Sequence, residues 1–170
     1  MIEYKRIDIT FAGEFMKIRE YRTADCAEIA DLFYDTVHTI NAKDYTKSQL
    51  DVWATGKIDI VAWDRSFTEH DTLVAEKNDM IVGFGDMDHT GYLDRLFVHK
   101  DYQGKGIATA ILNALEQRAA AQSITAFTTY ASITAKPFFE KHDYLLISGN
   151  TVVRNGVELT NFLMKKHTAK

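Results

Sequence analysis

Residues 92–115, YLDRLFVHKDYQGKGIATAILNAL, decide the fold, because an apolar strand, a loop with two glycines and an amphipathic helix follow one another within them. Gly104 and Gly106 allow the loop backbone to approach a ligand closely. The first free N–H groups of the helix point into the same loop, where the helix dipole adds positive potential. The segment therefore predicts an anion cradle that fits a pyrophosphate. The alternative is a strand-to-helix turn whose glycines serve only its backbone dihedral angles.

Three glycine-loop motifs compete for this segment. A P-loop requires Lys-Ser or Lys-Thr after its second glycine, and neither pair stands there. A dinucleotide fingerprint requires G-x-G-x-x-G, whereas residues 104–109 end in threonine and follow a meander of strands instead of opening a βαβ unit. The third motif, Gln/Arg-x-x-Gly-x-Gly/Ala, is satisfied by residues 103–108, QGKGIA.

With that hexapeptide the sequence resembles the GNAT superfamily, the GCN5-related N-acetyltransferases, whose signature is an apolar strand, this motif and an amphipathic helix. Residues 135–144, AKPFFEKHDY, are similar to the family pattern A-x-x-x-Y-E-K-x-G-F, and residues 131–140 resemble the YafP-like bacterial subgroup. The resemblance covers nearly the whole chain from Met16. It implies an N-terminal extension, residues 1–15, and a GNAT domain, residues 16–170. The extension has two readings, an added strand or a stretch upstream of a start at Met16, and Ile7, Ile9 and Phe11 alternate like a short strand.

The fold class that follows is α/β (α+β), a mixed, mostly antiparallel central sheet that is splayed between its middle strands and flanked by helices. Apolar spacing agrees, since it predicts helices over residues 24–40, 46–54, 107–119 and 135–141. Strands are expected over residues 72–76, 80–88, 92–98 and 124–130, and Asn155-Gly156 predicts a two-residue hairpin turn. Residues 55–70 receive no assignment, because their apolar side chains fit either period.

The resemblance implies that acetyl-CoA lies where the strand of residues 92–98 splays from that of residues 124–130. Its pantetheine arm is expected to pair with the backbone of Leu96, Phe97 and Val98. The pyrophosphate is expected to accept hydrogen bonds from backbone N–H groups of Gln103, Gly104, Lys105, Gly106, Ile107, Ala108 and Thr109. The Lys105 side chain has two readings, a contact to a CoA phosphate or a solvated loop lysine.

Two positions of the expected cofactor site depart from the family pattern. Ser132 stands where many members have an asparagine that contacts the cofactor, so this contact is expected to be shorter or mediated by water. Phe139 stands where many have the tyrosine that protonates the departing thiolate. The usual acid is therefore absent, and Tyr130 or water is expected to replace it.

The family reaction is direct attack of an amine on the thioester, without an acyl-enzyme intermediate. An alkylamine with a pKa near about 10.4 is mostly protonated at pH 7, so a group must take its proton. Asp94 is the first candidate, because strand alternation places it on one face with Tyr92, Leu96 and Val98. Since an aspartate is about six pKa units too acidic, Asp94 is expected to bind the ammonium and pass the proton through water. The alternative for Asp94 is a surface salt bridge.

Other residues compete for catalytic and substrate-binding roles. The rival bases are Tyr92, Glu76, Asp86 and Asp88. If Asp88 opposes Gly91 in the hairpin, Gly85 opposes Asp94 and leaves open space above it. The acceptor pocket is expected at the first two helices, with Phe33, His38 and Trp53, because this part of a GNAT usually shapes substrate choice. The alternative for that set is helix packing.

The composition limits which class of protein this chain can belong to and in which cellular compartment it is expected. The chain has 170 residues, enough for one domain, and a net charge of −4 that offers no general attraction to nucleic acid. No segment approaches 18 apolar residues, so no membrane span is expected. The single cysteine, Cys26, and an N-terminus without the apolar stretch of a signal peptide predict a cytoplasmic protein. The 6 histidines lack metal-binding spacing, so no metal is expected.

Three functions remain in order of preference. The first is an acetyltransferase that uses acetyl-CoA and a small-molecule or peptide amine, without nucleic acid or membrane partners, and for which the resemblance allows a homodimer. The second is a non-catalytic acyl-CoA binding or sensing module that keeps the cradle after losing the acid. The third is a nucleotide-binding protein of the Rossmann type.

Overall fold

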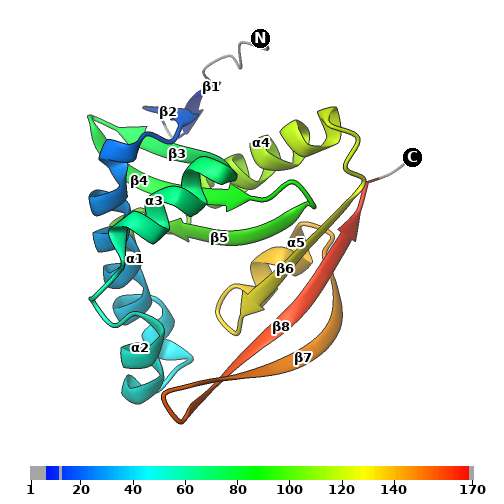
Figure 1. The fold of residues 1–170 in the computed structure, drawn as a ribbon. Coiled ribbons are helices and arrows are strands. Elements are labelled where there is room, and N and C mark those ends of the chain that lie inside the picture. The colour runs from blue at the N-terminus through cyan, green and yellow to red at the C-terminus, as the bar shows by residue number, and fades with distance from the viewer. Residues whose placement is uncertain (1–6, 12, 169–170) are drawn as a thin grey trace.

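The computed structural model of the protein describes residues 7–11 and 13–168, and within them one 8-stranded sheet has the order β1-β2-β3-β4-β5-β6-β8-β7 (Figure 1). Neighbouring strands are antiparallel except β5 and β6, which are parallel. The strands are β1 (Ile7–Phe11), β2 (Glu14–Glu20), β3 (Asp71–Lys77), β4 (Met80–Met87), β5 (Tyr92–Val98), β6 (Ala126–Ser132), β7 (Leu145–Arg154) and β8 (Val157–His167).

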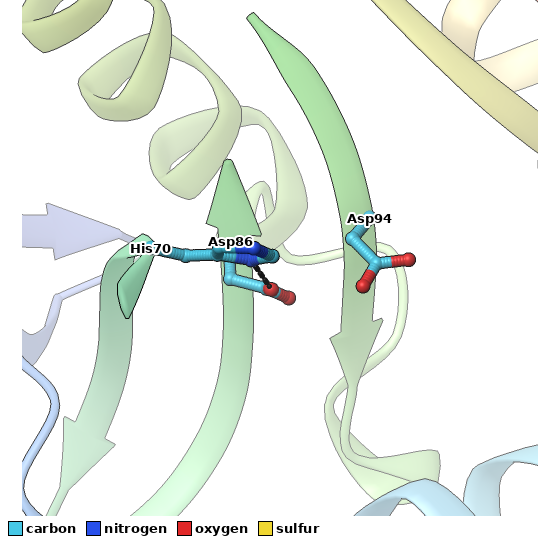
Figure 2. A group of neighbouring side chains, drawn as sticks. All are labelled: His70, Asp86 and Asp94. Atoms are coloured by element: carbon cyan, nitrogen blue, oxygen red, sulfur yellow. Dashed lines mark hydrogen bonds and ion pairs between the residues drawn. The ribbon is translucent and has the colours of Figure 1, made fainter. Parts of the chain in front are cut away.

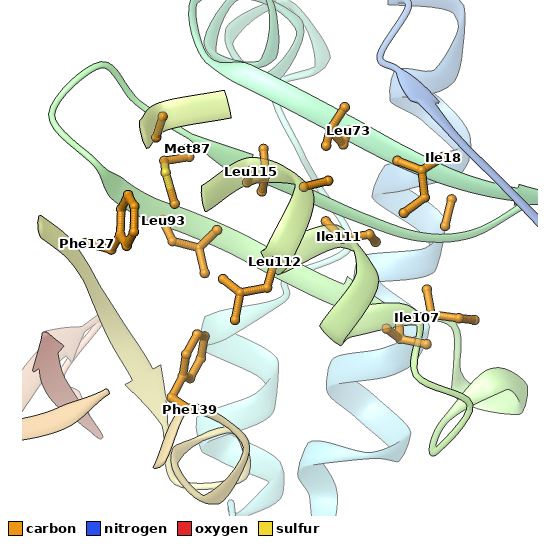
Figure 3. Close-up of a cluster of buried hydrophobic side chains, with 14 of the residues drawn as sticks. Ile18, Leu73, Met87, Leu93, Ile107, Ile111, Leu112, Leu115, Phe127 and Phe139 are labelled. Atoms are coloured by element: carbon orange, nitrogen blue, oxygen red, sulfur yellow. The ribbon is translucent and has the colours of Figure 1, made fainter. Parts of the chain in front are cut away.

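Helices cover both faces of the sheet, and an apolar core lies on each face. On one face Ile111 and Leu115 of α4 pack against Leu73 and Leu93 of the sheet (Figure 3). On the other face the core includes Phe33 of α1. The longer helices are α1 (Cys26–Thr39), α2 (Lys47–Trp53), α3 (Ile60–Glu69), α4 (Ile107–Ala121) and α5 (Lys136–Lys141). Among these described helices, none is long and apolar enough to cross a lipid bilayer.

The sheet opens between β5 and β6. Tyr92 pairs with Thr128 and Leu93 with Thr129, and the two strands then diverge, as the green and yellow arrows show in Figure 1. The predicted mixed sheet, mostly antiparallel and splayed between its middle strands, is confirmed.

The structure confirms the predicted hairpin turn and assigns a helix to the stretch that the sequence left unassigned. The hairpin predicted at Asn155-Gly156 joins β7 to β8, and both residues have positive φ, 48° and 77°. The unassigned stretch contains α3, whose Ile60 and Val61 are 42% and 72% exposed. Because these apolar side chains face solvent, they blur the helical period that a buried stripe would show.

β1 forms an edge strand within residues 1–15, where the alternation of Ile7, Ile9 and Phe11 predicted a short strand. It pairs with β2 from Ile7 opposite Ile18 to Phe11 opposite Glu14. The expected domain start at Met16 falls inside β2, where the Met16 and Ile18 side chains are buried in the core beneath α4. Residues 1–6 and 12 of the extension lie outside the described residues.

Two truncations test where the domain begins. A chain starting at Met16 is expected to fold with a modestly lower melting temperature, because it loses an edge strand and keeps Met16 and Ile18 in the core. A chain starting at Tyr21 loses both side chains and the pairing of β2 with β3, and is expected to lose its cooperative thermal transition. Circular dichroism melts measure both. A chain from Met16 that does not fold would make residues 1–15 part of the domain.

Candidate active site

A cleft of about 820 Å³ opens where β5 and β6 diverge. Gln103, Ala108 and Phe139 line it from the side of α4 and α5, and Phe33 and Trp53 line it from the opposite side. Because the lining comes from both faces of the sheet, the cleft connects Gln103 and Ala108, which flank the glycine pair, with an aromatic region on the other side. A donor and an acceptor can therefore enter from different faces and meet at the gap.

β5 presents backbone groups to this gap. His99 N–H donates to Val82 C=O at 2.9 Å, so these two residues form a hydrogen-bonded pair of the antiparallel ladder between β4 and β5. Because ladder bonds alternate along an antiparallel strand, Phe97 bonds to β4, whereas the N–H and C=O groups of Leu96 and Val98 point into the gap. The expected pairing of the strand with a ligand therefore narrows to Leu96 and Val98, and Phe97 contributes only its ring to the cleft.

The loop after β5 has the backbone conformation of an anion cradle. Gly104 and Gly106 both have positive φ, 70° and 76°, a region that other residues rarely adopt. Gly106 is the N-cap of α4 and no side chain caps the helix, so the N–H groups of Ile107, Ala108 and Thr109 lack partners within the helix. The positive end of the helix dipole lies at the same place, and these groups together favour a bound anion.

Side chains around the loop bind to neighbouring protein groups. Gln103 Nε2 and the Thr36 hydroxyl donate to Val98 C=O at 2.6 and 3.0 Å. The Thr109 hydroxyl lies 3.0 Å from Nε2 of His142, the residue that follows α5. These contacts hold the loop and the start of α4 in place, and the backbone of the loop remains for a ligand. Gly104, Lys105, Gly106, Ile107 and Thr109 are not among the residues that line the 820 Å³ cleft itself.

The two polar side chains at the remaining cofactor positions also have partners. Lys105 Nζ lies 3.9 Å from a Glu14 carboxylate oxygen and 5.0 Å from the centre of the Tyr102 ring, and the Lys105 side chain is 42% exposed to solvent. Ser132 lines the cleft, and its hydroxyl oxygen accepts from Ala135 N–H at 3.0 Å. The hydroxyl proton of Ser132 stays available to a ligand in the cleft.

A β-bulge between β4 and β5 overturns the predicted hairpin register. Gly85 pairs with Leu96 and not with Asp94, because the pairing shifts near the end of β4. A Cβ on Gly85 would lie 3.0 Å from Ile111 and 3.1 Å from Leu96, so this glycine faces α4 and provides no space for an acceptor. Asp94 is the extra residue of the bulge and has no partner on β4.

The bulge also changes the face on which Asp94 lies. Leu96 and Val98 pack into the core beneath α4, so the expectation that Asp94 shares their face is wrong. Asp94 instead lines the cleft together with Tyr92 of β5 and Tyr130 of β6. The structure thus brings together the three residues that were expected to act in catalysis.

The environment of Asp94 favours a carboxylate that stays accessible. Its side chain is 40% exposed, and Arg95 Nη2 lies 3.5 Å away. Partial burial, followed by the charge of Asp86, raises the pKa of Asp94 above its ordinary value. Burial and the charge of Asp94 raise the pKa of Tyr92 to about 12, so this hydroxyl keeps its proton at neutral pH and can donate it in a hydrogen bond. The Tyr130 ring centre is 6.2 Å from that of Tyr92.

The rival carboxylates are bound to other protein groups. Glu76 accepts from Arg19 Nε at 2.7 Å. Asp88 accepts from Thr90 N–H at 2.8 Å and holds its own turn. Asp86 is 0% exposed. None of the three lines the cleft, so the structure favours Asp94 as the carboxylate that meets an acceptor.

Two of the four expected acceptor residues do not line the cleft. Phe33 and Trp53 line it, whereas Gly85 faces α4 and His38 lies outside. The His38 Nε2 atom is 2.8 Å from Ala54 C=O, and its ring is 4.3 Å from that of Tyr34. His38 therefore joins α1 to the end of α2, which is the helix-packing alternative.

Sequence reasoning missed Arg95, Trp63 and His70. The Arg95 guanidinium lies 5.1 Å from the centre of the Trp63 ring and 4.1 Å from that of Phe67, and it binds Asp86. Arg95 and Trp63 line the cleft. The i, i+4 spacing of Trp63 and Phe67 was the available signal, but α3 had no assignment.

Comparisons with known proteins agree on one family. The family model described as the acetyltransferase (GNAT) domain matches residues 41–166. The uncharacterised N-acetyltransferase YafP of Escherichia coli strain K12 is 32% identical over 151 residues, which are 88% of this chain and 95% of that protein. A crystal structure of a GCN5-related N-acetyltransferase from Rhodopseudomonas palustris has a TM-score of 0.85 at 32% identity, covering 95% of this chain and 98% of that one.

A more distant structure shares the fold. The PaiA N-acetyltransferase of Thermoplasma acidophilum, solved in complex with coenzyme A, has a TM-score of 0.75 at 16% identity. The similarity covers 89% of this chain and 98% of that chain.

Proposed function

The chain belongs to the GNAT acetyltransferase family, and from this premise we propose that it moves an acetyl group from acetyl-CoA to a primary amine by direct attack in a ternary complex. The observation that carries the proposal is the placement of Asp94. Its carboxylate lies in the gap of the sheet, on the cleft that links the glycine loop to the aromatic region. The hairpin's other carboxylates, Asp86 and Asp88, are bound to internal partners.

The donor side of the cleft suits acetyl-CoA. The N–H and C=O groups of Leu96 and the N–H group of Val98 face the gap and can pair with the amide groups of a pantetheine arm, whereas Val98 C=O already accepts from Gln103 and Thr36. The N–H groups that follow Gly106 can bind a pyrophosphate. Solved GNAT structures with similar folds contain coenzyme A or acetyl-CoA, which supports the same donor here.

The proton path begins at Asp94. Its carboxylate holds the ammonium form of the acceptor beside the thioester, and a water molecule carries the proton away because the carboxylate is too weak a base to take it alone. The neutral nitrogen then attacks the acetyl carbon, the carbon–sulfur bond breaks, and the nitrogen releases its surplus proton to water as the amide forms. The Tyr92 hydroxyl, protonated at neutral pH, Tyr130 or water supplies the proton that the thiolate takes.

Phe139 favours one alternative, an acyl-CoA sensor without transfer activity. Its side chain is 3% exposed and carries no hydroxyl, so the acid of the family pattern is missing. Free-thiol release from acetyl-CoA, measured with a panel of primary amines, separates the two functions. Amine-dependent release is expected. Tight acetyl-CoA binding without amine-dependent release from any amine would favour the sensor.

A further inference from the structure

A histidine and two carboxylates meet behind the acceptor end of the cleft (Figure 2). His70, Asp86 and Asp94 place ligand atoms within 4.8 Å of one another. The His70 Nδ1 atom is 2.6 Å from Asp86 Oδ2, the contact drawn as a dashed line. His70 directly follows α3, Asp86 lies near the end of β4 and Asp94 lies on β5, so three separate parts of the chain form the cluster.

Arg95 binds the carboxylate at the centre of this cluster. Its Nε and Nη2 atoms donate to the two carboxylate oxygens of Asp86 at 2.9 and 2.7 Å. The same Nη2 donates to the Ser66 hydroxyl at 2.7 Å and lies 3.5 Å from Asp94. Both oxygens of the fully buried Asp86 are therefore used by a cation, and the cluster is a charge network.

The network contains a histidine, the side chain whose ordinary pKa lies closest to neutral pH. Arg95 is a permanent cation, and it binds both oxygens of the Asp86 carboxylate. His70 is neutral or positive, and its side chain is 21% exposed, so it exchanges protons with solvent. With neutral His70 the four groups carry one net negative charge, and with protonated His70 they carry none.

We propose that His70, Asp86 and Arg95 are positioning residues behind Asp94, and that the proton on His70 sets the net charge which the acceptor site presents to an ammonium substrate. The proposal rests on the proposed function, in which Asp94 holds that ammonium. Arg95 anchors the unit, because Trp63 and Phe67 pack against its guanidinium and Asp86 binds it through two oxygens. Asp94 is the only one of the four groups with a largely accessible side chain, 40% exposed against 21%, 0% and 12% for His70, Asp86 and Arg95.

The direction of the pH effect follows from the groups that surround His70. The Asp86 hydrogen bond raises the pKa of His70 above its ordinary value, Asp94 adds to the effect, and burial and Arg95 oppose it. Asp88, after β4, is a further negative neighbour. At a pH below this raised pKa, His70 is protonated and the ammonium meets four groups without net charge. At a pH above it, His70 is neutral and the same four groups carry one net negative charge. The affinity for a cationic acceptor is therefore expected to rise as pH rises through neutrality.

The first test needs no turnover. Proton–carbon NMR follows the His70 ring across pH, with His70→Gln used to assign its signal. The His70 pKa is expected above 6.5 in the wild type and lower in Asp94→Asn, which removes a neighbouring negative charge. Butylammonium chloride is expected to lower it as well, compared with sodium chloride at equal ionic strength, because linked binding is reciprocal. A His70 pKa that is the same under all these conditions would overturn the proposal.

The second test measures KM for a primary alkylamine that stays protonated throughout. From about pH 6 to about pH 8 the wild-type KM is expected to fall about fivefold, with a smaller change in kcat. His70→Gln is expected to abolish this fall in KM with pH. His167→Gln, at an exposed histidine that does not line the cleft, is expected to retain it. A KM step that survives in His70→Gln would contradict the proposal.

The two tests separate failure of this inference from failure of the proposed function. If no amine causes thiol release, the acetyltransferase proposal fails, and the NMR titration still decides whether His70 responds to Asp94 and to a bound ammonium. If amines are acetylated and neither measurement responds, only the role of His70 is wrong.

Discussion

A Gly104→Asp variant is expected to bind acetyl-CoA about a hundredfold or more weakly than the wild type. Gly104 has a φ of 70°, which aspartate tolerates better than most residues, and no atom lies within 4 Å of the site of a new Cβ. The fold therefore accommodates the side chain. A carboxylate about 4 Å from one pyrophosphate charge, at an effective dielectric constant of about 20, costs about 4 kcal/mol. Isothermal titration calorimetry measures the affinity.

Gly104→Asn is the matched control for this loop. Its side chain has the same shape and tolerates the same backbone conformation, but it carries no charge. We expect its acetyl-CoA affinity to stay within about fivefold of the wild type, since the uncharged amide does not repel the pyrophosphate. Thermal melts of the two variants should agree. Equal acetyl-CoA affinities for both variants would place the pyrophosphate away from this loop.

Asp94→Asn is expected to lower kcat for a primary amine about tenfold or more, with acetyl-CoA affinity within about threefold of the wild type. The variant removes the charge that holds the ammonium and the base that starts the proton path. The amide keeps the size of the side chain, and Asp94 has no partner on β4 that the fold would lose. Steady-state kinetics with a confirmed amine and calorimetry with acetyl-CoA give the two values.

Asp31→Asn is the control for the charge change. Asp31 is an exposed aspartate on α1 and does not line the cleft, so its variant is expected to keep wild-type kinetics. Unchanged turnover in Asp94→Asn would remove Asp94 from the mechanism. Equal losses in both variants would point to a general effect of net charge.

The parts of the fold that the sequence predicted well depend on local signals. The strand, loop and helix of residues 92–121 follow from an apolar run, the pair Gly104 and Gly106, and a helical apolar period, all within one segment. The same holds for the turn at Asn155-Gly156. Such signals need no knowledge of what packs against the segment.

The missed features depend on contacts between distant segments. Simple alternation put Asp94 on a face with Leu96 and Val98, and the bulge that overturns this is a mismatch between two strands. The pairing of Arg95 with Asp86 and the approach of His70 join three elements, and α3 was not assigned. The site was thus predictable as a cofactor loop with one candidate carboxylate, while the charges behind that carboxylate required the tertiary structure.

Mass spectrometry of a reaction with limiting acetyl-CoA tests direct acetyl transfer to an amine most directly. Before an amine is added, the protein mass should be unchanged, because no acyl-enzyme forms. After a primary amine is added, the acetylated amine should appear in an amount equal to the free CoA. An acetyl group on the protein chain, or free CoA without acetylated amine, would contradict direct transfer in the cleft between β5 and β6.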